Sequence, residues 1–206
     1  WLVSSAALAQ PQFEDVSWRV PPVAGVRGIT MGDVDNDGWP DLFITSDRGR
    51  SALLLNDAGR RWSDRSRRLP AAMESVAAGG VFADMDDDGD LDLIVPLLHG
   101  PALLRNDQGD FLDVSSQSGL PQVPVDVVLW FDANRDGRLD LFISASGRQE
   151  LRLHLATGLG GARFASTELH LGVVGSVSAG VTRGAVAADV NGDDWPGLIV
   201  AVAEGA

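Results

Sequence analysis

The residues with the clearest chemical potential lie in short acidic windows. Three windows follow the pattern D-x-[DN]-x-D-G-x-x-D, with carboxylate or amide oxygens at positions 1, 3, 5 and 9. Ca²⁺ takes about six to eight oxygen ligands, and this alternation turns several side chains toward one point. Glycine at position 6 permits the sharp reversal that directs the carbonyl of position 7 at the same ion. The predicted calcium ligands are Asp33, Asp35, Asp37, Asp41, Asp84, Asp86, Asp88, Asp92, Asp132, Asn134, Asp136 and Asp140, with Trp39, Asp90 and Arg138 through their backbone carbonyls.

A fourth window, residues 189–197, departs from this pattern. Gly197 replaces the aspartate of position 9, and Asp194 replaces the glycine of position 6. Oxygens remain at positions 1, 3 and 5, on Asp189, Asn191 and Asp193. We therefore expect calcium binding there to be weak or lost.

An EF-hand is the obvious competing interpretation, and the sequence argues against it. That loop needs a bidentate glutamate at position 12 and a helix on either side. Position 12 is instead Ile44, Val95 or Ile143, each inside a short apolar run of strand type. The windows are therefore predicted to be calcium-binding loops that each connect two strands. The alternative of solvated Asp/Gly turns does not explain why oxygens recur at positions 1, 3, 5 and 9.

The windows belong to an internal repeat. They begin 51, 48 and 57 residues apart, and each lies between two short runs rich in Val, Ile, Leu and Phe. A third run follows, ALLLND, ALLRND or LRLHL, and then a fourth, RWSDRS, FLDVSS or RFASTE. Runs of this length and composition are typical of strands. Four strands in about fifty residues predict an all-β fold, a β-propeller of four-stranded blades.

The repeat region, 10–206, holds about three and a half such blades. We place them at about 26–67, 77–118, 124–169 and 183–206, the last one partial. The segment 13–16 resembles the fourth-strand motif at 111–114, so it is a candidate to complete the last blade and close the ring. A four-bladed ring is one possibility, and a fragment of a longer propeller is the simpler one.

The composition of the chain limits which partners and which cellular locations are expected. The net charge is −13, which argues against nucleic acid as a partner, and the windows hold sixteen of the 29 acidic residues. There is no Cys, and no apolar run is long enough to span a membrane. Residues 1–9 end in an A-x-A pattern, Ala7-Leu8-Ala9, and are predicted to be the remnant of a signal peptide, with a buried first strand as the alternative. Export is therefore expected.

Taken together, the windows and the LxxND and FxDVSxxSGL patterns resemble the FG-GAP/VCBS repeats of the integrin α-subunit propeller family, over about 12–203. They look most like the secreted bacterial branch related to cartilage acidic protein, which often carries an ASPIC/UnbV domain. The resemblance implies a seven-bladed β-propeller with Ca²⁺ between the first and second strands of several blades. It further implies a binding or adhesion scaffold for protein or carbohydrate ligands, secreted, periplasmic or on the bacterial cell surface.

No catalytic constellation is visible, so we predict that the protein is not an enzyme. His99, His154 and His170 lie in separate segments without metal or triad spacing. The alternative is the propeller domain of a polysaccharide-acting, lyase-like enzyme, or a lectin. A cluster of five arginines around Trp62 either contacts an anionic glycan or protein, or keeps an edge strand from pairing, and the second role is favoured.

Overall fold

The computed structural model describes residue 15 and residues 17–70, 73, 79–146, 151–169 and 180–204. The predicted signal remnant, His170 and all of the segment 13–16 except Asp15 lie outside these residues. Within the described residues, no helix is long and apolar enough to cross a membrane.

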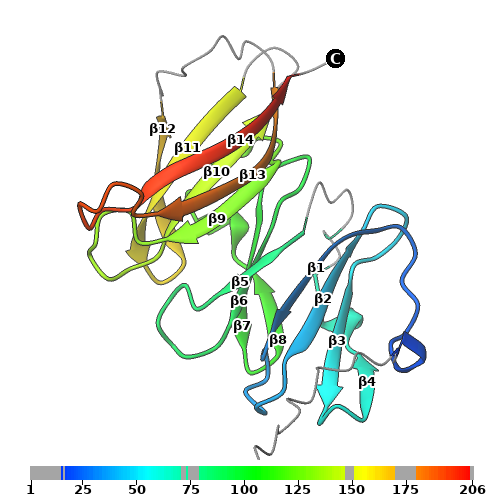
Figure 1. Ribbon diagram of the computed structural model, residues 1–206. Coiled ribbons are helices and arrows are strands. Elements are labelled where there is room, and N and C mark those ends of the chain that lie inside the picture. Colours follow the sequence, from blue (N-terminus) through cyan, green and yellow to red (C-terminus); the bar gives the residue numbers. More distant parts are fainter. Residues whose placement is uncertain are drawn as a thin grey trace, which may run out of the picture.

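The described residues form antiparallel sheets and three short 3-10 turns (Figure 1). The first sheet is β1 (Val26–Gly32), β2 (Asp41–Ser46), β3 (Ala52–Asp57) and β4 (Arg61–Asp64). The second is β5 (Val81–Ala83), β6 (Asp92–Val95), β7 (Ala102–Asp107) and β8 (Asp110–Asp113). The third is β9 (Val127–Phe131), β10 (Asp140–Ser146), β11 (Leu151–Gly160) and β12 (Arg163–Leu169), and the fourth is the hairpin of β13 (Gly180–Ala188) and β14 (Gly197–Glu204). The 3-10 turns are η1 (Ser17–Arg19), η2 (Ser66–Arg68) and η3 (Ser115–Gln117).

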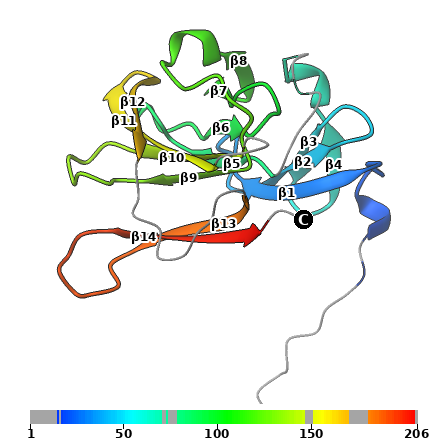
Figure 2. The same cartoon turned by 90° about the horizontal axis from the view of Figure 1, so that it is seen from above.

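This architecture confirms the predicted all-β class and its four-stranded antiparallel sheets. In each of the three complete sheets the strands lie in sequence order, so every neighbour in the sheet is also a neighbour along the chain. The two-stranded fourth sheet corresponds to the half blade expected at the end of the sequence. The four sheets of the described residues do not form a closed ring (Figure 2).

The core lies between successive sheets. Phe43 and Leu53 of the first sheet pack with Leu93 and Leu104 of the second. Ile94, the residue after Leu93, points the other way and packs in a second cluster with the third sheet. Strand side chains alternate between the two faces of a sheet, so a sheet stacked on both faces needs apolar residues at every position. This explains why the three residues of β6 that follow Asp92 are all apolar and all buried.

The stacking brings the first strands together. β1 contacts β5, β5 contacts β9, and β9 contacts β13, and these strands lie side by side near the middle of the four sheets (Figure 2). Each first strand leads directly into an acidic window before the second strand begins. The windows therefore become the loops that connect the inner strands to the rest of each sheet.

Candidate metal loops

The four acidic loops share one backbone arrangement, set by the aspartate of position 1. In the first loop, the amides of Asp37 and Gly38 donate to the two carboxylate oxygens of Asp33, at 3.0 and 2.8 Å. The same pair of hydrogen bonds recurs on Asp84, Asp132 and Asp189. Position 1 thus closes each loop by accepting the amides of positions 5 and 6.

Two backbone positions in each loop adopt the left-handed conformation. In the first loop these are position 4, Asn36 with φ of 57°, and position 6, Gly38 with φ of 88°. In the fourth loop the glycine sits at position 4 instead, as Gly192 with φ of 76°, and Asp194 takes φ of 67° at position 6. Short polar side chains tolerate this region, so the exchange is accommodated. The fourth loop therefore keeps the turn despite its departures from the pattern.

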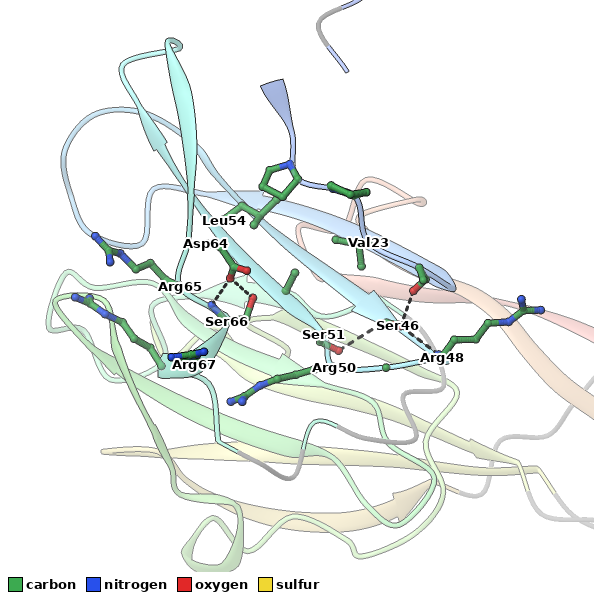
Figure 3. A pocket seen from close by; sticks show the side chains of 16 residues that line it. Val23, Ser46, Arg48, Arg50, Ser51, Leu54, Asp64, Arg65, Ser66 and Arg67 are labelled. Carbon is green, nitrogen blue, oxygen red and sulfur yellow. Dashed lines mark hydrogen bonds between the residues drawn. The ribbon is translucent and has the colours of Figure 1, made fainter. Parts of the chain in front are cut away.

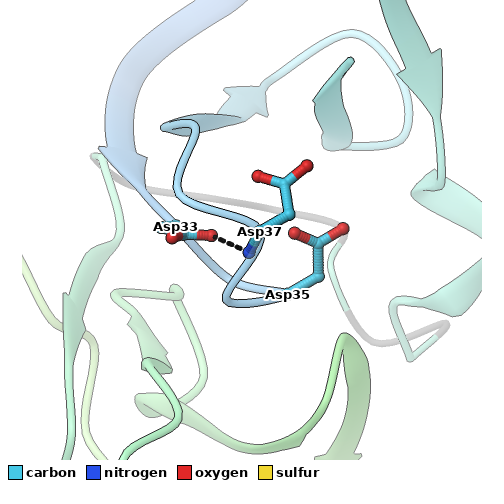
Figure 4. A group of neighbouring side chains, drawn as sticks. All are labelled: Asp33, Asp35 and Asp37. Atoms are coloured by element: carbon cyan, nitrogen blue, oxygen red, sulfur yellow. Dashed lines mark hydrogen bonds between the residues drawn. The ribbon is translucent and has the colours of Figure 1, made fainter. Parts of the chain in front are cut away.

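The first two loops each gather three carboxylates. Oxygens of Asp33, Asp35 and Asp37 lie within 4.8 Å of one another (Figure 4), as do those of Asp84, Asp86 and Asp88 in the second loop. These two aspartate triplets could hold a metal ion, and they coincide with six of the predicted ligands.

One oxygen in each triplet is left without a partner. Oδ1 of Asp35 and Oδ1 of Asp86 are buried and accept no hydrogen bond. Burial and then the charge of Asp37 raise the pKa of Asp35 above its usual value. Burial followed by the charges of Asp88 and Asp84 raises the pKa of Asp86. Buried oxygens with no donor and crowded by like charge are the environment in which a hard cation is most stabilising, so Ca²⁺ fits both loops.

The third and fourth loops satisfy their carboxylates internally. In the third, the Asn134 amide donates to Asp136 Oδ2 at 3.1 Å, and the Arg138 guanidinium pairs with the same oxygen at 2.7 Å. The backbone N–H of Arg138, then these two side chains, lower the pKa of Asp136. In the fourth loop Asn191 donates to Asp193 at 2.8 Å. These loops bring their predicted ligands together but already supply positive or donor groups to them.

Position 9 differs from the other predicted ligands. Asp41, Asp92 and Asp140 are almost completely buried at the starts of β2, β6 and β10, and the first two lie outside the triplets. One oxygen of each accepts the amide of position 2, and the other accepts an amide of the third strand, from Asn56, Asn106 or Gly158. The carboxylate therefore fastens the loop to two strands.

These buried carboxylates have no described cation beside them. Burial raises the pKa of Asp41 to about 6 and the pKa of Asp92 to about 6, against the effect of the two amides that each accepts. In the first sheet Asp35 and Asp37 add to this shift through their charge. A cation in the loop would reverse it.

Position 7 contributes through its backbone. The amides of Trp39, Asp90 and Arg138 each donate to the carboxylate of position 5, at 2.8 to 2.9 Å. The Asp90 side chain is engaged elsewhere, because it accepts the Asn36 amide at 2.6 Å and the backbone N–H of Gln108 at 2.8 Å. This is compatible with the predicted use of the position 7 carbonyl rather than of a side chain.

Neighbouring loops are linked in pairs, which the sequence analysis did not anticipate. The bond from Asn36 to Asp90 joins the first loop to the second. A buried Asn106 amide also donates to the carbonyl of Val34, at 2.7 Å. Between the third and fourth loops, the Arg135 guanidinium lies over the Trp195 ring, 5.5 Å from its centre. The Asn that recurs in the ALLLND and ALLRND runs is the signal in the sequence that accompanies the contact from Asn106.

The two described histidines do not meet. His99 is exposed after β6, while His154 is buried in β11, where burial lowers its pKa. His99 lies in a turn that follows β6 of the second sheet, whereas His154 lies in the third sheet.

An all-β chain built from repeated four-stranded sheets, with an aspartate loop after each first strand, defines a class of repeat protein. Residues 33–95 match the family model described as FG-GAP-like repeat. Cartilage acidic protein 1 of Xenopus tropicalis is 26% identical over 128 residues, a stretch that covers 58% of this chain and 20% of that protein. No solved structure matches the chain. The similarity to an FG-GAP-like repeat therefore covers residues 33–95, and the chain matches only about a fifth of the length of this relative.

Proposed function

We propose that the protein is a calcium-stabilised, propeller-like scaffold that binds other molecules outside the cell. The observation that carries the calcium part is the buried, unpartnered oxygen in each triplet, on Asp35 and Asp86. Ca²⁺ bound there would receive oxygens from positions 1, 3 and 5, and from the position 7 carbonyl. The buried aspartate of position 9 would hold the loop in place for it.

The third loop is proposed as a third, weaker site, because Arg138 competes with a cation for Asp136. The fourth is proposed as the weakest, since it has no carboxylate at position 9. At a dissociation constant of roughly 10 μM and about 2 mM free Ca²⁺, each occupied site would add on the order of 3 kcal/mol to the free energy of unfolding. This concentration range fits the proposed secreted, periplasmic or cell-surface location.

A binding or adhesion role is proposed from the repeat family and from the shape of the molecule. The Asp loops and the connections at the other end of each sheet leave side chains exposed on a rigid set of strands. Binding residues are often carried on loops positioned by such a scaffold. The proposed ligands are proteins or carbohydrates, and we propose no catalytic role.

The calcium part is tested by isothermal titration calorimetry on the purified chain and by thermal unfolding with calcium or a chelator. We expect two tight sites and a marked rise in melting temperature with calcium. The double variant D35N/D86N should lose most of both effects, because each triplet loses the carboxylate that has the unpartnered oxygen.

The matched control is D57N/D107N, which removes the same charge from exposed ends of β3 and β7 outside the loops. It should bind calcium as the wild type does. Calcium binding that survives in D35N/D86N, or that is absent from the wild type, would overturn the proposed sites.

A further inference from the structure

A pocket of about 850 Å³ lies on the first sheet, at the end opposite its aspartate loop (Figure 3). The connection from β2 to β3 and the segment after β4 form its rim, and these are the ends of the sheet that the first loop does not reach. Ala52 and Leu54 of β3 lie beneath it and are buried, and the Pro21–Ala24 segment forms one wall, with apolar side chains that are partly exposed. A cavity of this volume is in the range of sites that hold small ligands or short peptide segments.

The rim is strongly basic in a protein that is strongly acidic. Of the residues that the structure describes, five arginines and one carboxylate, that of Asp64, line the pocket. These arginines are Arg48, Arg50, Arg65, Arg67 and Arg68. The first sheet is therefore acidic at its aspartate loop and basic at its other end.

Most of these guanidinium groups form no salt bridge with a described residue. Among the described residues, Arg48, Arg65 and Arg67 form no salt bridge, whereas Arg68 pairs with Asp110 at 3.5 Å. After the hydrogen bonds from Ser66, the charges of Arg67 and Arg50 also help to lower the pKa of Asp64, so these two arginines share one carboxylate. Arg50 donates to the carbonyl of Leu69, which ties the two parts of the rim together. The pocket thus presents several donors that are not neutralised by the described residues.

The fold itself does not require these arginines. In the second sheet, Ser115 accepts the amide of Leu103 and bonds to Asp113, just as Ser66 accepts the amide of Leu53 and bonds to Asp64. The two turns are therefore equivalent residue by residue. The positions of Arg65, Arg67 and Arg68 are taken there by Val114, Ser116 and Gln117.

Protection of an edge strand does not account for them either. β4 ends at Asp64, so Arg65, Arg67 and Arg68 follow the strand and lie in or beside η2. Of the arginines near Trp62, only Arg61 belongs to β4, where it pairs with Asp57. The interpretation favoured from sequence alone therefore applies to Arg61 and not to the pocket.

We propose that this pocket binds an acidic peptide segment, one that carries Asp or Glu beside an apolar residue. Guanidinium groups bind carboxylates through paired hydrogen bonds, and clusters of arginine are an established way to recognise acidic motifs. The partly exposed apolar side chains of Pro22, Val23 and Ala24 on the wall suit the neighbouring apolar side chain. The described lining residues include no aromatic one, so they do not supply the flat ring on which sugars usually stack. This inference deepens the proposed scaffold role and is independent of the calcium loops.

Fluorescence anisotropy with a short fluorescein-labelled peptide of alternating Glu and Leu tests the proposal, with saturating calcium present. We expect binding that weakens as salt is added, and at least about a ten-fold weaker dissociation constant for R65V/R67S. Both replacements are the residues found at the equivalent positions of the second sheet, so the fold accommodates them. The control R60S/R61S removes the same charge at the other end of the sheet and should change affinity by less than about two-fold.

Three results would overturn the proposal. These are no peptide binding by the wild type, equal binding of a peptide in which Gln replaces Glu, or binding of oligogalacturonate but not of the peptide, which would identify a glycan site. A parallel calcium titration of R65V/R67S keeps the two proposals separate. Normal calcium binding beside failed peptide binding in the wild type would reject the pocket alone.

Discussion

The first two aspartate loops and the last two share one backbone conformation, but the pKa values of their carboxyl groups are shifted in opposite directions. All four close on the position 1 carboxylate. In the first pair a buried oxygen of Asp35 or Asp86 has no partner, and the pKa of that residue is raised. In the second pair an asparagine amide donates to position 5, and the pKa of Asp136 and of Asp193 is lowered by bonds to the backbone and then to side chains.

The difference comes from very few residues. Position 3 is aspartate in the first pair and asparagine in the second, and position 7 of the third loop adds a cation, Arg138. An amide at position 3 both removes a charge and donates a hydrogen bond to the carboxylate at position 5. The shared backbone therefore forms the same loop in every repeat. The residues at positions 3 and 7 determine how strongly a bound cation would stabilise that loop.

The largest effect we expect is on the pH dependence of stability in the first pair. A carboxyl whose pKa rises from 3.8 to about 6 favours the protonated form in the folded state, at on the order of 3 kcal/mol for each of Asp41 and Asp92. Without calcium, the free energy of unfolding should therefore fall as pH increases from about 4 to 6. Calcium favours the carboxylate, so the slope should reverse when it is present.

Urea unfolding at a series of pH values, with calcium or with a chelator, measures this reversal. The comparison variant D57N changes an exposed carboxylate and should leave both slopes unchanged. If stability without calcium rises with pH over that interval, the buried carboxylates do not have raised pKa values.

The next effect concerns the link between the first two loops. N106A should lower the free energy of unfolding by about 3 kcal/mol, because it leaves two buried carbonyls and the Gly109 amide without partners. N56A is the matched variant, since Asn56 makes the same bonds within its own sheet but none to another. It should cost about 1 kcal/mol less. Equal losses in urea unfolding would mean that the bond to Val34 contributes nothing.

A third prediction concerns substitutions that should exchange the calcium affinities of the first and third loops. D35N should weaken calcium binding at the first loop by about ten-fold or more, because ligand charge sets affinity in such sites. N134D/R138S should strengthen it at the third loop by a similar factor. Calorimetric titration measures both. R135S removes an arginine of the same loop that contacts Trp195 rather than Asp136, so it should leave calcium affinity nearly unchanged.

The smallest effect tests the shared backbone. D194G should raise the free energy of unfolding by about 0.5–1 kcal/mol, because glycine adopts the left-handed conformation without strain. G38A in the first loop should lower it by a comparable amount, since an added Cβ there would touch nothing and the cost is conformational. Thermal unfolding with a chelator present compares the two. Changes of the same sign would mean that the loops do not share their conformation.

Much of the fold followed from the sequence because its signals are local. The four apolar runs of each repeat and the glycine at position 6 act over a few residues, and the strands formed as expected. The conformation of the fourth loop was harder to predict. Its glycine lies at position 4 and not at position 6, which departs from the D-x-[DN]-x-D-G-x-x-D pattern although the turn is the same.

What could not be predicted depends on contacts between repeats. The bond from Asn106 to Val34 spans 72 residues, and Arg135 meets a tryptophan of the next loop. The burial of Asp41 was not predicted either, for a different reason: its second partner, Asn56, lies on the next strand of the same sheet, 15 residues further along the chain. The basic pocket also needed the structure, which separates Arg65 and Arg67 from the edge strand where the sequence had placed them.

The order of the strands has a consequence for how the chain folds. Within each complete sheet, every strand pairs with one that directly precedes or follows it in sequence, so contact order inside a sheet is low for an all-β protein. Each sheet can therefore form as soon as its own residues have emerged from the ribosome or crossed a membrane. Later sheets would then pack onto the open face of the preceding sheet, in the stepwise manner of repeat proteins whose stability propagates between nearest neighbours.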